Sequence, residues 1–213
     1  LVGCGSNSVP GTLANMDALR GLRVDGWLVV VPFYNKPTQE GLFRYFKAIA
    51  EASDKPIVLY NVPGRTGANM QAQTCLRIAR EIPGVVGVKE GAGNMEQVLE
   101  ILSGKPDGFG VISGDDDMTL EMMRHGAAGV ISVASNIRPA EVCAMVHSAA
   151  EGDFQAASSR DAALQPLYKA CFVESNPIPA KAALSILGLC GPWMRLPLVP
   201  ASNSTVSLLK GLL

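Results

Sequence analysis

The sequence lacks the features that several common classes of protein require. Only 17% of its 213 residues are charged, and the formal net charge is -1 at pH 7. No block of like charge indicates binding to nucleic acid or to an anionic membrane surface. The apolar runs, such as Trp27–Pro32 and Val85–Val88, are much shorter than the roughly 20 residues that span a bilayer. We therefore expect no nucleic-acid partner and no membrane partner.

Cysteine and histidine are too few and too dispersed to suggest a disulfide scaffold or a metal centre. The five cysteines form no Cys-x-x-Cys pair, and an odd, scattered set is typical of a reducing compartment. His125 and His147 have no further ligand at metal-binding spacing, and they do not favour a Ser-His-Asp triad. No signal-peptide pattern follows Leu1, and we expect the chain to begin within the fold. These absences predict a cytoplasmic protein without a zinc site.

Short, continuous apolar runs recur at intervals of roughly 20–30 residues, which is the size of a βα unit. None alternates polar with apolar residues, as is typical of strands buried on both faces of a parallel sheet. The predicted strands are Trp27–Pro32, Pro56–Tyr60, Val85–Val88, Phe109–Ser113 and Gly129–Ala134, with Leu1–Gly3 as a shortened sixth. Amphipathic segments between them predict helices over Leu42–Ala52, Thr74–Glu81, Met95–Leu102 and Met118–His125.

From Pro139 onward the strand pattern stops. We therefore predict two parts, an α/β part over residues 1–138 and a C-terminal helical region over residues 139–213. Six strands cannot close an eight-stranded barrel, so either two N-terminal βα units are missing from this chain or the sheet is open. The predicted C-terminal helices are Glu141–Ala150, Phe154–Phe172, Pro179–Leu187 and Ser202–Leu212.

Lys89 is the first candidate for a reactive side chain. It directly follows Val85–Val88, at the carboxyl end of a predicted buried strand, and in a βα barrel this end faces the active site. Partial desolvation there disfavours the ammonium form and makes a nucleophilic amine accessible near neutral pH. The alternative is a structural lysine paired with Glu90 or with another carboxylate. Position alone does not decide between the two.

Two further polar side chains are predicted at the same rim. Tyr60 ends the preceding strand, and a phenol there can relay protons or bind a carboxylate. Arg65 lies in the Pro/Gly-rich loop that follows, where a guanidinium can hold a substrate carboxylate through two hydrogen bonds. Taken singly, each is more typical of a solvated side chain. Together with Lys89 they favour an active site.

Two other segments have more than one interpretation. Ser113–Asp117 follows a predicted strand, and its carboxylates could form a metal site. We favour a cap for the helix that follows, with the Gly114 backbone lining the cavity. Phe33 and Tyr34 follow another strand, where they could be core residues or could project from a rim loop into a partner.

Taken together, these segments resemble the dihydrodipicolinate synthase family. The resemblance runs along the whole chain in order, and the lysine strand is shared by the wider group of pyruvate-dependent class I aldolases, which includes N-acetylneuraminate lyase. The Tyr-Asn-x-Pro-x-Arg-Thr and Asn-Pro-Ile-Pro strings favour the synthase. The matching segments are Pro32–Asn35, Leu59–Gly67, Gly87–Glu90, Ser113–Asp116 and Phe172–Pro179.

The resemblance implies a (β/α)₈ TIM barrel that lacks its first two βα units in this chain and carries a C-terminal helical appendage. It implies no metal and no cofactor. The implied reaction condenses pyruvate with L-aspartate 4-semialdehyde to give 4-hydroxy-tetrahydrodipicolinate, in lysine and diaminopimelate biosynthesis. The implied assembly is a homotetramer, built as a dimer of dimers. Another pyruvate-dependent aldolase, or a truncated non-catalytic fragment, is the alternative.

The same resemblance assigns roles to individual residues. It implies that Lys89 forms a Schiff base with pyruvate, that Tyr60 binds the pyruvate and relays protons, and that Tyr34 reaches across a dimer interface into the neighbouring subunit's site. Arg65 is implied to bind the carboxylate of aspartate semialdehyde. Two positions are implied to contact the pyruvate through their backbone, and these are Gly114 and Ile131.

Two departures from the family's pattern change what we expect. The family's relay threonine lies in a Gly-Thr-Thr-Gly-Glu loop that this sequence does not contain, so we expect these residues alone not to form a closed, fully active barrel. In lysine-sensitive members an Asn, a Glu four residues later and a Tyr line an allosteric pocket. Here Asn7 matches, but Gly11 replaces the Glu and Phe33 replaces the Tyr. This predicts weak or absent inhibition by lysine.

Overall fold

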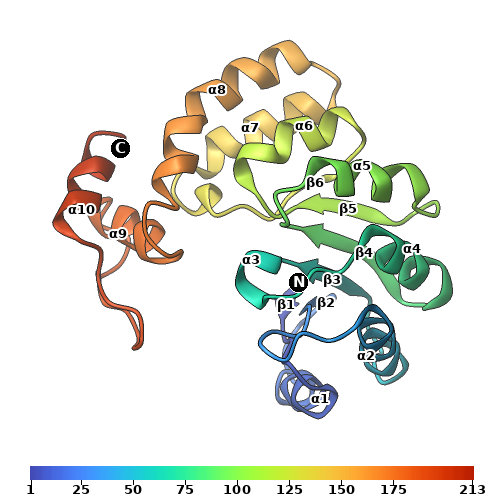
Figure 1. Cartoon of the computed structure of the whole chain (residues 1–213). Helices are drawn as coiled ribbons and strands as arrows, with labels where there is room; N and C mark the ends of the chain where they lie inside the picture. Colours follow the sequence, from blue (N-terminus) through green and yellow to red (C-terminus); the bar gives the residue numbers. More distant parts are fainter. The chain divides into compact units, whose positions relative to one another are not determined.

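A computed structural model describes all of residues 1–213 and contains one six-stranded parallel sheet (Figure 1). The strands lie side by side in chain order, each parallel to the next. A doubly wound sheet reverses its strand order at a switch point, whereas a barrel does not. The sheet is therefore a curled, parallel half-barrel within an α/β fold. Its strands are β1 (Val2–Gly3), β2 (Trp27–Val30), β3 (Ile57–Asn61), β4 (Val85–Glu90), β5 (Gly110–Ser113) and β6 (Gly129–Val130).

The connecting helices form a layer over one face of this sheet (Figure 1). In this layer α2 packs against both α1 and α4, and α4 packs against α5. Side chains at the helix starts satisfy free backbone N–H groups, as when Thr38 Oγ1 accepts from the N–H of Gly41. The helices are α1 (Val9–Ala18), α2 (Gln39–Glu51), α4 (Ala72–Glu81) and α5 (Met95–Gly104), and a single turn, α3 (Pro63–Thr66), follows β3.

The two faces of the sheet differ in burial. Val29, Leu59 and Val88 occupy one register row, and each is fully buried beneath the helices. The next row along the strands points to the opposite face, because successive side chains alternate. Its members Tyr60 and Ile112 are only half-buried. Even the less buried face is partly covered, so apolar residues occur on both faces of the strands. This explains the continuous apolar runs in the sequence.

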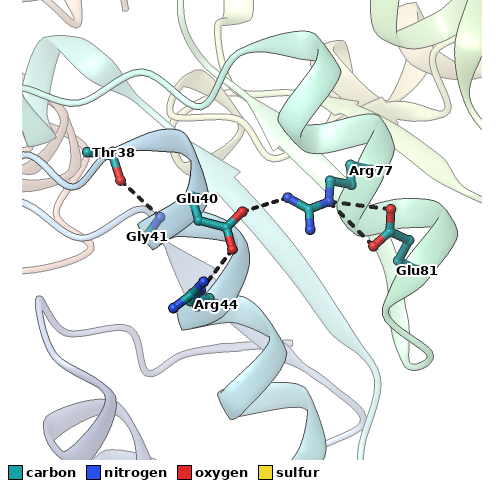
Figure 2. A network of polar contacts seen from close by, with 6 residues as sticks. All are labelled: Thr38, Glu40, Gly41, Arg44, Arg77 and Glu81. Atoms are coloured by element: carbon teal, nitrogen blue, oxygen red, sulfur yellow. Dashed lines mark hydrogen bonds and ion pairs between the residues drawn. The ribbon is translucent and has the colours of Figure 1, made fainter.

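An exposed network of charged side chains joins α2 to α4 (Figure 2). The Glu40 carboxylate accepts hydrogen bonds from Arg44 Nε at 2.8 Å and from Arg77 at 2.7 Å. Arg77 also reaches Glu81 at 3.4 Å, and its guanidinium lies 3.6 Å from the centroid of the Phe43 ring. The bond from Arg77, followed by that from Arg44, lowers the pKa of Glu40. Because these groups are solvated and screened by salt, they orient the two helices more than they stabilise the fold.

The chain packs into two compact units, residues 1–115 with 125–130 and residues 116–124 with 131–213. In the second unit α7 lies along α8, and α10 packs against α9. All four helices that were predicted after Pro139 are present. The domain boundary at residue 138 stays a prediction. The helices of this unit are η1 (Asp116–Met118), α6 (Thr119–Arg124), η2 (Ala134–Asn136), α7 (Pro139–Ala150), α8 (Phe154–Ala170), α9 (Ile178–Ile186) and α10 (Asn203–Lys210).

Several expected elements differ in the structure. The prediction missed α1, although Ser8 caps it and Pro10 lies in its first turn, because its apolar pattern is weak. The last strand ends at Val130 rather than Ala134, because the chain turns there into η2. Arg65 lies in the helical turn α3 and not in an irregular loop. None of the helices combines the length and the hydropathy that a membrane crossing needs.

Candidate active site

The sheet register brings Tyr60 and Lys89 together. They are aligned partners on β3 and β4, and Lys89 Nζ lies 4.2 Å from the centroid of the Tyr60 ring. The residue at position 89 lies inside β4, which runs on to Glu90, so the prediction that it directly follows the strand was wrong by two residues. The Lys89 side chain is only 9% exposed. A largely desolvated amine therefore sits against an aromatic ring at the carboxyl end of the sheet.

The environment of Tyr60 favours its neutral phenol. Burial raises the pKa of Tyr60 above its ordinary value. The positive charge of Arg65 lowers this pKa by a smaller amount, and the negative charge of Asp115 raises it. A phenol that keeps its proton can donate a hydrogen bond to a carboxylate or a carbonyl oxygen at the rim. Tyr60 therefore suits the binding of an anionic substrate beside Lys89.

Glycine backbone lines the neighbouring strand end. The N–H of Gly114 donates to the carbonyl oxygen of Glu90 at 2.6 Å. A Cβ at position 114 would lie 2.9 Å from that oxygen and 2.9 Å from Gly91 Cα, which is closer than real Cβ atoms approach other atoms. Only glycine fits there without a shift of the backbone. The ends of β4 and β5 thus meet closely, and the rim beside Lys89 stays clear of a side chain from position 114.

Hydrogen bonds fix the backbone of the segment that carries Tyr34, whereas the ring of Tyr34 is exposed to solvent. The Tyr34 side chain is 87% exposed, which contradicts the alternative that it is a core residue. Its φ of 74° is a backbone conformation that few non-glycine residues adopt. The Tyr34 N–H donates to the Thr66 carbonyl oxygen at 3.1 Å, and Asn35 Nδ2 donates to the Asn7 carbonyl oxygen at 2.8 Å. The loop is therefore anchored to α3 and to the segment before α1, and it presents the phenol outward.

The remaining predicted residues fall in different places. Arg65 is exposed on α3, near enough for its charge to act on Tyr60. Phe33 is 42% exposed beside Tyr34, and Asn7 is half-buried. Ile131 belongs to the second compact unit, where it follows β6 and is half-buried.

The acidic segment after β5 does not gather its carboxylates in one place. Ser113 Oγ accepts the N–H of Asp115, which forms a local turn. The Asp116 carboxylate accepts the N–H groups of Val133 and Ala134, so it caps the start of η2. Asp116 therefore caps η2, which the sequence did not predict, and the cap that we expected for the helix after Asp117 stays a prediction. The structure holds no group of three or more His, Cys, Asp or Glu side chains placed to bind a metal ion.

Sequence reasoning missed a buried polar cluster directly behind Lys89. It considered Glu90 only as a partner for that lysine. In the structure the Glu90 side chain is 1% exposed, and its carboxylate accepts hydrogen bonds from Asn61, Gln97 and the N–H of Ala92. The sequence did contain one sign of this cluster. Side chains alternate in direction along a strand, so residues 89 and 90 point to opposite faces of the sheet.

Comparison with known proteins identifies the family to which this chain belongs. The whole chain, residues 1–213, matches the dihydrodipicolinate synthetase family. A 4-hydroxy-tetrahydrodipicolinate synthase of Thermotoga neapolitana is 45% identical over 216 residues, covering 100% of this chain and 74% of that protein. The crystal structure of a dihydrodipicolinate synthase from Thermotoga maritima superposes with a TM-score of 0.97 at 44% identity, covering 99% of this chain and 72% of that one.

A third relative was solved with a ligand. It is a chloride-inhibited dihydrodipicolinate synthase of Acinetobacter baumannii complexed with pyruvate. This protein is 40% identical, with a TM-score of 0.95, and the match covers 99% of this chain and 72% of that one. Sequence, fold and the order of the matching segments agree along the whole chain, and this chain belongs to the dihydrodipicolinate synthetase family.

Proposed function

We propose that this protein is a class I, Schiff-base lyase that condenses pyruvate with L-aspartate 4-semialdehyde to give 4-hydroxy-tetrahydrodipicolinate. The observation that carries the proposal is the pair formed by Lys89 and Tyr60, with Nζ 4.2 Å from the ring centroid at the carboxyl end of the parallel sheet. The names of the relatives support the same activity. The reaction belongs to lysine and diaminopimelate biosynthesis, and a cytoplasmic location fits that role.

The proposed fold of the working enzyme is a (β/α)₈ TIM barrel. We assign β1–β6 to its third to eighth strands, because their uninterrupted chain order is that of a barrel. The first two βα units, with the relay threonine, are then not among these 213 residues. This chain covers 74% of the length of the relative from T. neapolitana. The C-terminal helices from residue 139 onward form the appendage.

In the proposed mechanism the Lys89 amine attacks the keto carbon of pyruvate, and loss of water gives a protonated imine. This imine withdraws electrons, so the pyruvate methyl group loses a proton and becomes an enamine carbon. The enamine carbon then attacks the aldehyde carbon of the semialdehyde and forms the new carbon–carbon bond. Attack of the semialdehyde's amino group on the imine carbon closes the ring and releases Lys89. The protonated imine formed on Lys89 serves as the electron sink, so the chemistry requires no metal and no cofactor.

The surrounding residues bind substrates and move protons. We assign Tyr60 to the pyruvate carboxylate and to proton relay, because its phenol is neutral and adjacent to Lys89. Arg65 binds the carboxylate of the semialdehyde, since a guanidinium holds a carboxylate through two hydrogen bonds. The backbone at Gly114 and at Ile131 contacts pyruvate. Closure of the barrel around the enamine would exclude bulk water from it.

The exposed Tyr34 supports an oligomeric enzyme. Its ring is 87% exposed although its backbone is held in a rare conformation, an arrangement that suits a side chain presented to another subunit. We propose that Tyr34 completes the proton relay of a neighbouring subunit across a dimer interface. The assembly would be a homotetramer built as a dimer of dimers.

Reductive trapping tests the proposed chemistry directly. Borohydride reduces an imine to a stable amine, so incubation of the full chain with pyruvate and borohydride should add one reduced pyruvate to the protein. Peptide mapping by mass spectrometry should place this adduct on Lys89. An adduct on another lysine, or none at all under conditions in which the protein is folded, would overturn the assignment.

Regulation by lysine should be weak or absent. Gly11 supplies no carboxylate for the ammonium group of a bound lysine, and Phe33 supplies no hydroxyl. Ser6 and Ser8 also crowd Gly11, since a Cβ there would lie 2.6 Å from Ser6 Oγ. We expect turnover to fall little when L-lysine is titrated at physiological concentrations. Strong inhibition in that range would show that Asn7 and its neighbours still form a functional allosteric pocket.

A further inference from the structure

The buried cluster behind Lys89 lies in the register row next to the reactive pair. Tyr60 aligns with Lys89, and the following residues, Asn61 and Glu90, align with each other. Asn61 is fully buried and Glu90 is 1% exposed. Because strand residues alternate in direction, Tyr60 and Lys89 point to one face of the sheet and Asn61 and Glu90 to the other, beneath the helix layer. The end of β3 therefore carries Tyr60 on one face and the buried Asn61 on the other. The end of β4 carries Lys89 and Glu90 in the same arrangement.

The Glu90 carboxylate is fully occupied by hydrogen-bond donors. Asn61 Nδ2 donates to both of its oxygens, at 3.0 and 3.1 Å. Gln97 Nε2, from α5, donates to Oε2 at 3.1 Å, and the N–H of Ala92 donates to Oε1 at 2.9 Å. These contacts come from β3, from α5 and from the turn after β4. One carboxylate thus joins three elements that surround the end of the lysine strand.

The orientations of the two amides are fixed by backbone groups. Asn61 Oδ1 accepts the N–H of Met70 at 2.9 Å, so its Nδ2 must face Glu90. Gln97 Nε2 also contacts the carbonyl oxygen of Met70 at 3.3 Å, and that oxygen can only accept. Gln97 Oε1 in turn accepts from Asn69 Nδ2 at 2.9 Å. The amides therefore present N–H groups to Glu90, and the cluster is built around an acceptor.

A cluster of this kind requires the carboxylate form of Glu90. A protonated acid would direct its O–H at an amide N–H and lose a hydrogen bond. Burial, assisted by the negative charge of Asp115, raises the pKa of Glu90 to about 7, and the bonds from Asn61, Gln97 and Ala92 oppose this. A buried carboxylate held only by amides costs stability. Its presence at this position indicates a role beyond packing.

We propose that Glu90 is a positioning residue for the Schiff-base reaction: through its two bonds to Asn61 it locks the end of β4 to the end of β3 and so holds Lys89 against Tyr60. The backbone adds to this lock, because the N–H of Gly91 donates to the Asn61 carbonyl oxygen at 2.9 Å. Glu90 does not touch substrate and acts only through the placement of its neighbour. The inference rests on the proposed function, since it assigns a role to Glu90 within that chemistry.

The test is the rate of adduct formation in single-substitution variants of the full chain. Glu90→Gln keeps the shape of the side chain but turns an N–H toward the donors of the cluster. We expect the rate of borohydride-trapped adduct formation with pyruvate to fall roughly 10- to 100-fold, because small displacements of reacting groups have effects of that size. The matched control, Glu100→Gln, makes the same chemical change at an exposed position of α5 and should react at the wild-type rate.

A paired variant separates positioning from a general loss of structure. In Glu90→Gln with Asn61→Asp the donor and the acceptor are exchanged, so the link between the strands can form again. We expect this double variant to recover at least about 10-fold in rate over Glu90→Gln alone. Asn61→Leu removes the same strand-to-strand link from the β3 side, so it should lower the rate to a similar extent, and it replaces Glu90→Gln if that variant does not fold. Thermal unfolding of each variant shows whether it is folded.

The outcomes are distinguishable. A folded Glu90→Gln variant that reacts at the wild-type rate would overturn the positioning role, as would an exchanged pair that is folded but no faster than Glu90→Gln. A wild-type rate in folded Asn61→Leu, where that variant stands in for Glu90→Gln, would overturn it too. Failure of the proposed function gives a different result, because the wild-type protein itself would then form no adduct on Lys89.

Discussion

Lys89→Arg should abolish the pyruvate adduct and lower turnover by about 10³-fold or more, which is the scale on which loss of a covalent nucleophile acts in other enzymes. Arginine keeps the positive charge and a long side chain, and it can still stack on the Tyr60 ring. Its guanidinium stays protonated at any pH that proteins tolerate, so it cannot attack a keto carbon. The substitution therefore removes the nucleophile while leaving the electrostatics of the strand end close to those of the native protein.

The measurement is the intact mass of the protein after treatment with pyruvate and borohydride, together with the turnover number. Lys47→Arg is the control, because Lys47 is an exposed lysine on α2 that takes no part in the site. That variant should retain both the adduct and the turnover number of the unsubstituted protein. An adduct that persists in Lys89→Arg would mean that another amine carries the chemistry.

Tyr60→Phe is expected to lower turnover by about 10²- to 10⁴-fold, the range found for loss of a general acid–base group. The phenyl ring still covers Lys89, so the packing at the end of β3 is preserved. What is lost is the hydroxyl that we assign to the pyruvate carboxylate and to proton transfer. Because burial raises the pKa of Tyr60 above the ordinary value of a phenol, the hydroxyl stays protonated at neutral and mildly alkaline pH. Ionisation of Tyr60 should therefore produce no fall in wild-type activity between pH 7 and 9.

Tyr45→Phe is the matched control for this substitution. Tyr45 is also buried, and its hydroxyl donates to the Ser6 carbonyl oxygen at 2.7 Å and lies 2.7 Å from Thr12 Oγ1. Loss of that hydroxyl should reduce the free energy of unfolding by about 1–3 kcal/mol, because it leaves buried partners unsatisfied. Turnover of the folded protein should stay unchanged. Equal losses of turnover in the two variants would argue against a chemical role for Tyr60.

The sequence predicted most strands of this fold well because they carry apolar residues on both faces. Before their polar ends, β3 and β4 are apolar on both faces over Ile57–Leu59 and Val85–Val88, so they form short continuous runs without the spacing of an amphipathic helix. The alignment of Tyr60 with Lys89 also followed from their positions at the ends of neighbouring parallel strands. The missed helix, Val9–Ala18, shows the opposite case, since only Thr12 and Met16 of its residues are buried. A helix with so small a buried face leaves little periodicity to detect.

The role of Glu90 could not be predicted from the sequence for a different reason. A glutamate after a strand lysine suggests an ion pair. Only the three-dimensional placement of Asn61 and Gln97 shows that amides occupy its oxygens. Likewise, the exposure of Tyr34 depends on a backbone conformation that is set by contacts with Thr66, which is remote in the sequence. Long-range hydrogen bonds of this kind leave no local pattern.

The uninterrupted strand order has a consequence for how the site is assembled during folding. The two strand ends that carry Tyr60 and Lys89 belong to consecutive strands of one βαβ segment, and the buried hydrogen bond between Asn61 and Glu90 at these ends joins residues 29 positions apart. The entropic cost of closing such a loop grows only slowly with its length, so this pairing does not depend on distant parts of the chain. Every residue of the reactive pair and of the buried link behind it therefore lies in one continuous segment, which is complete before β5 and β6 are synthesised.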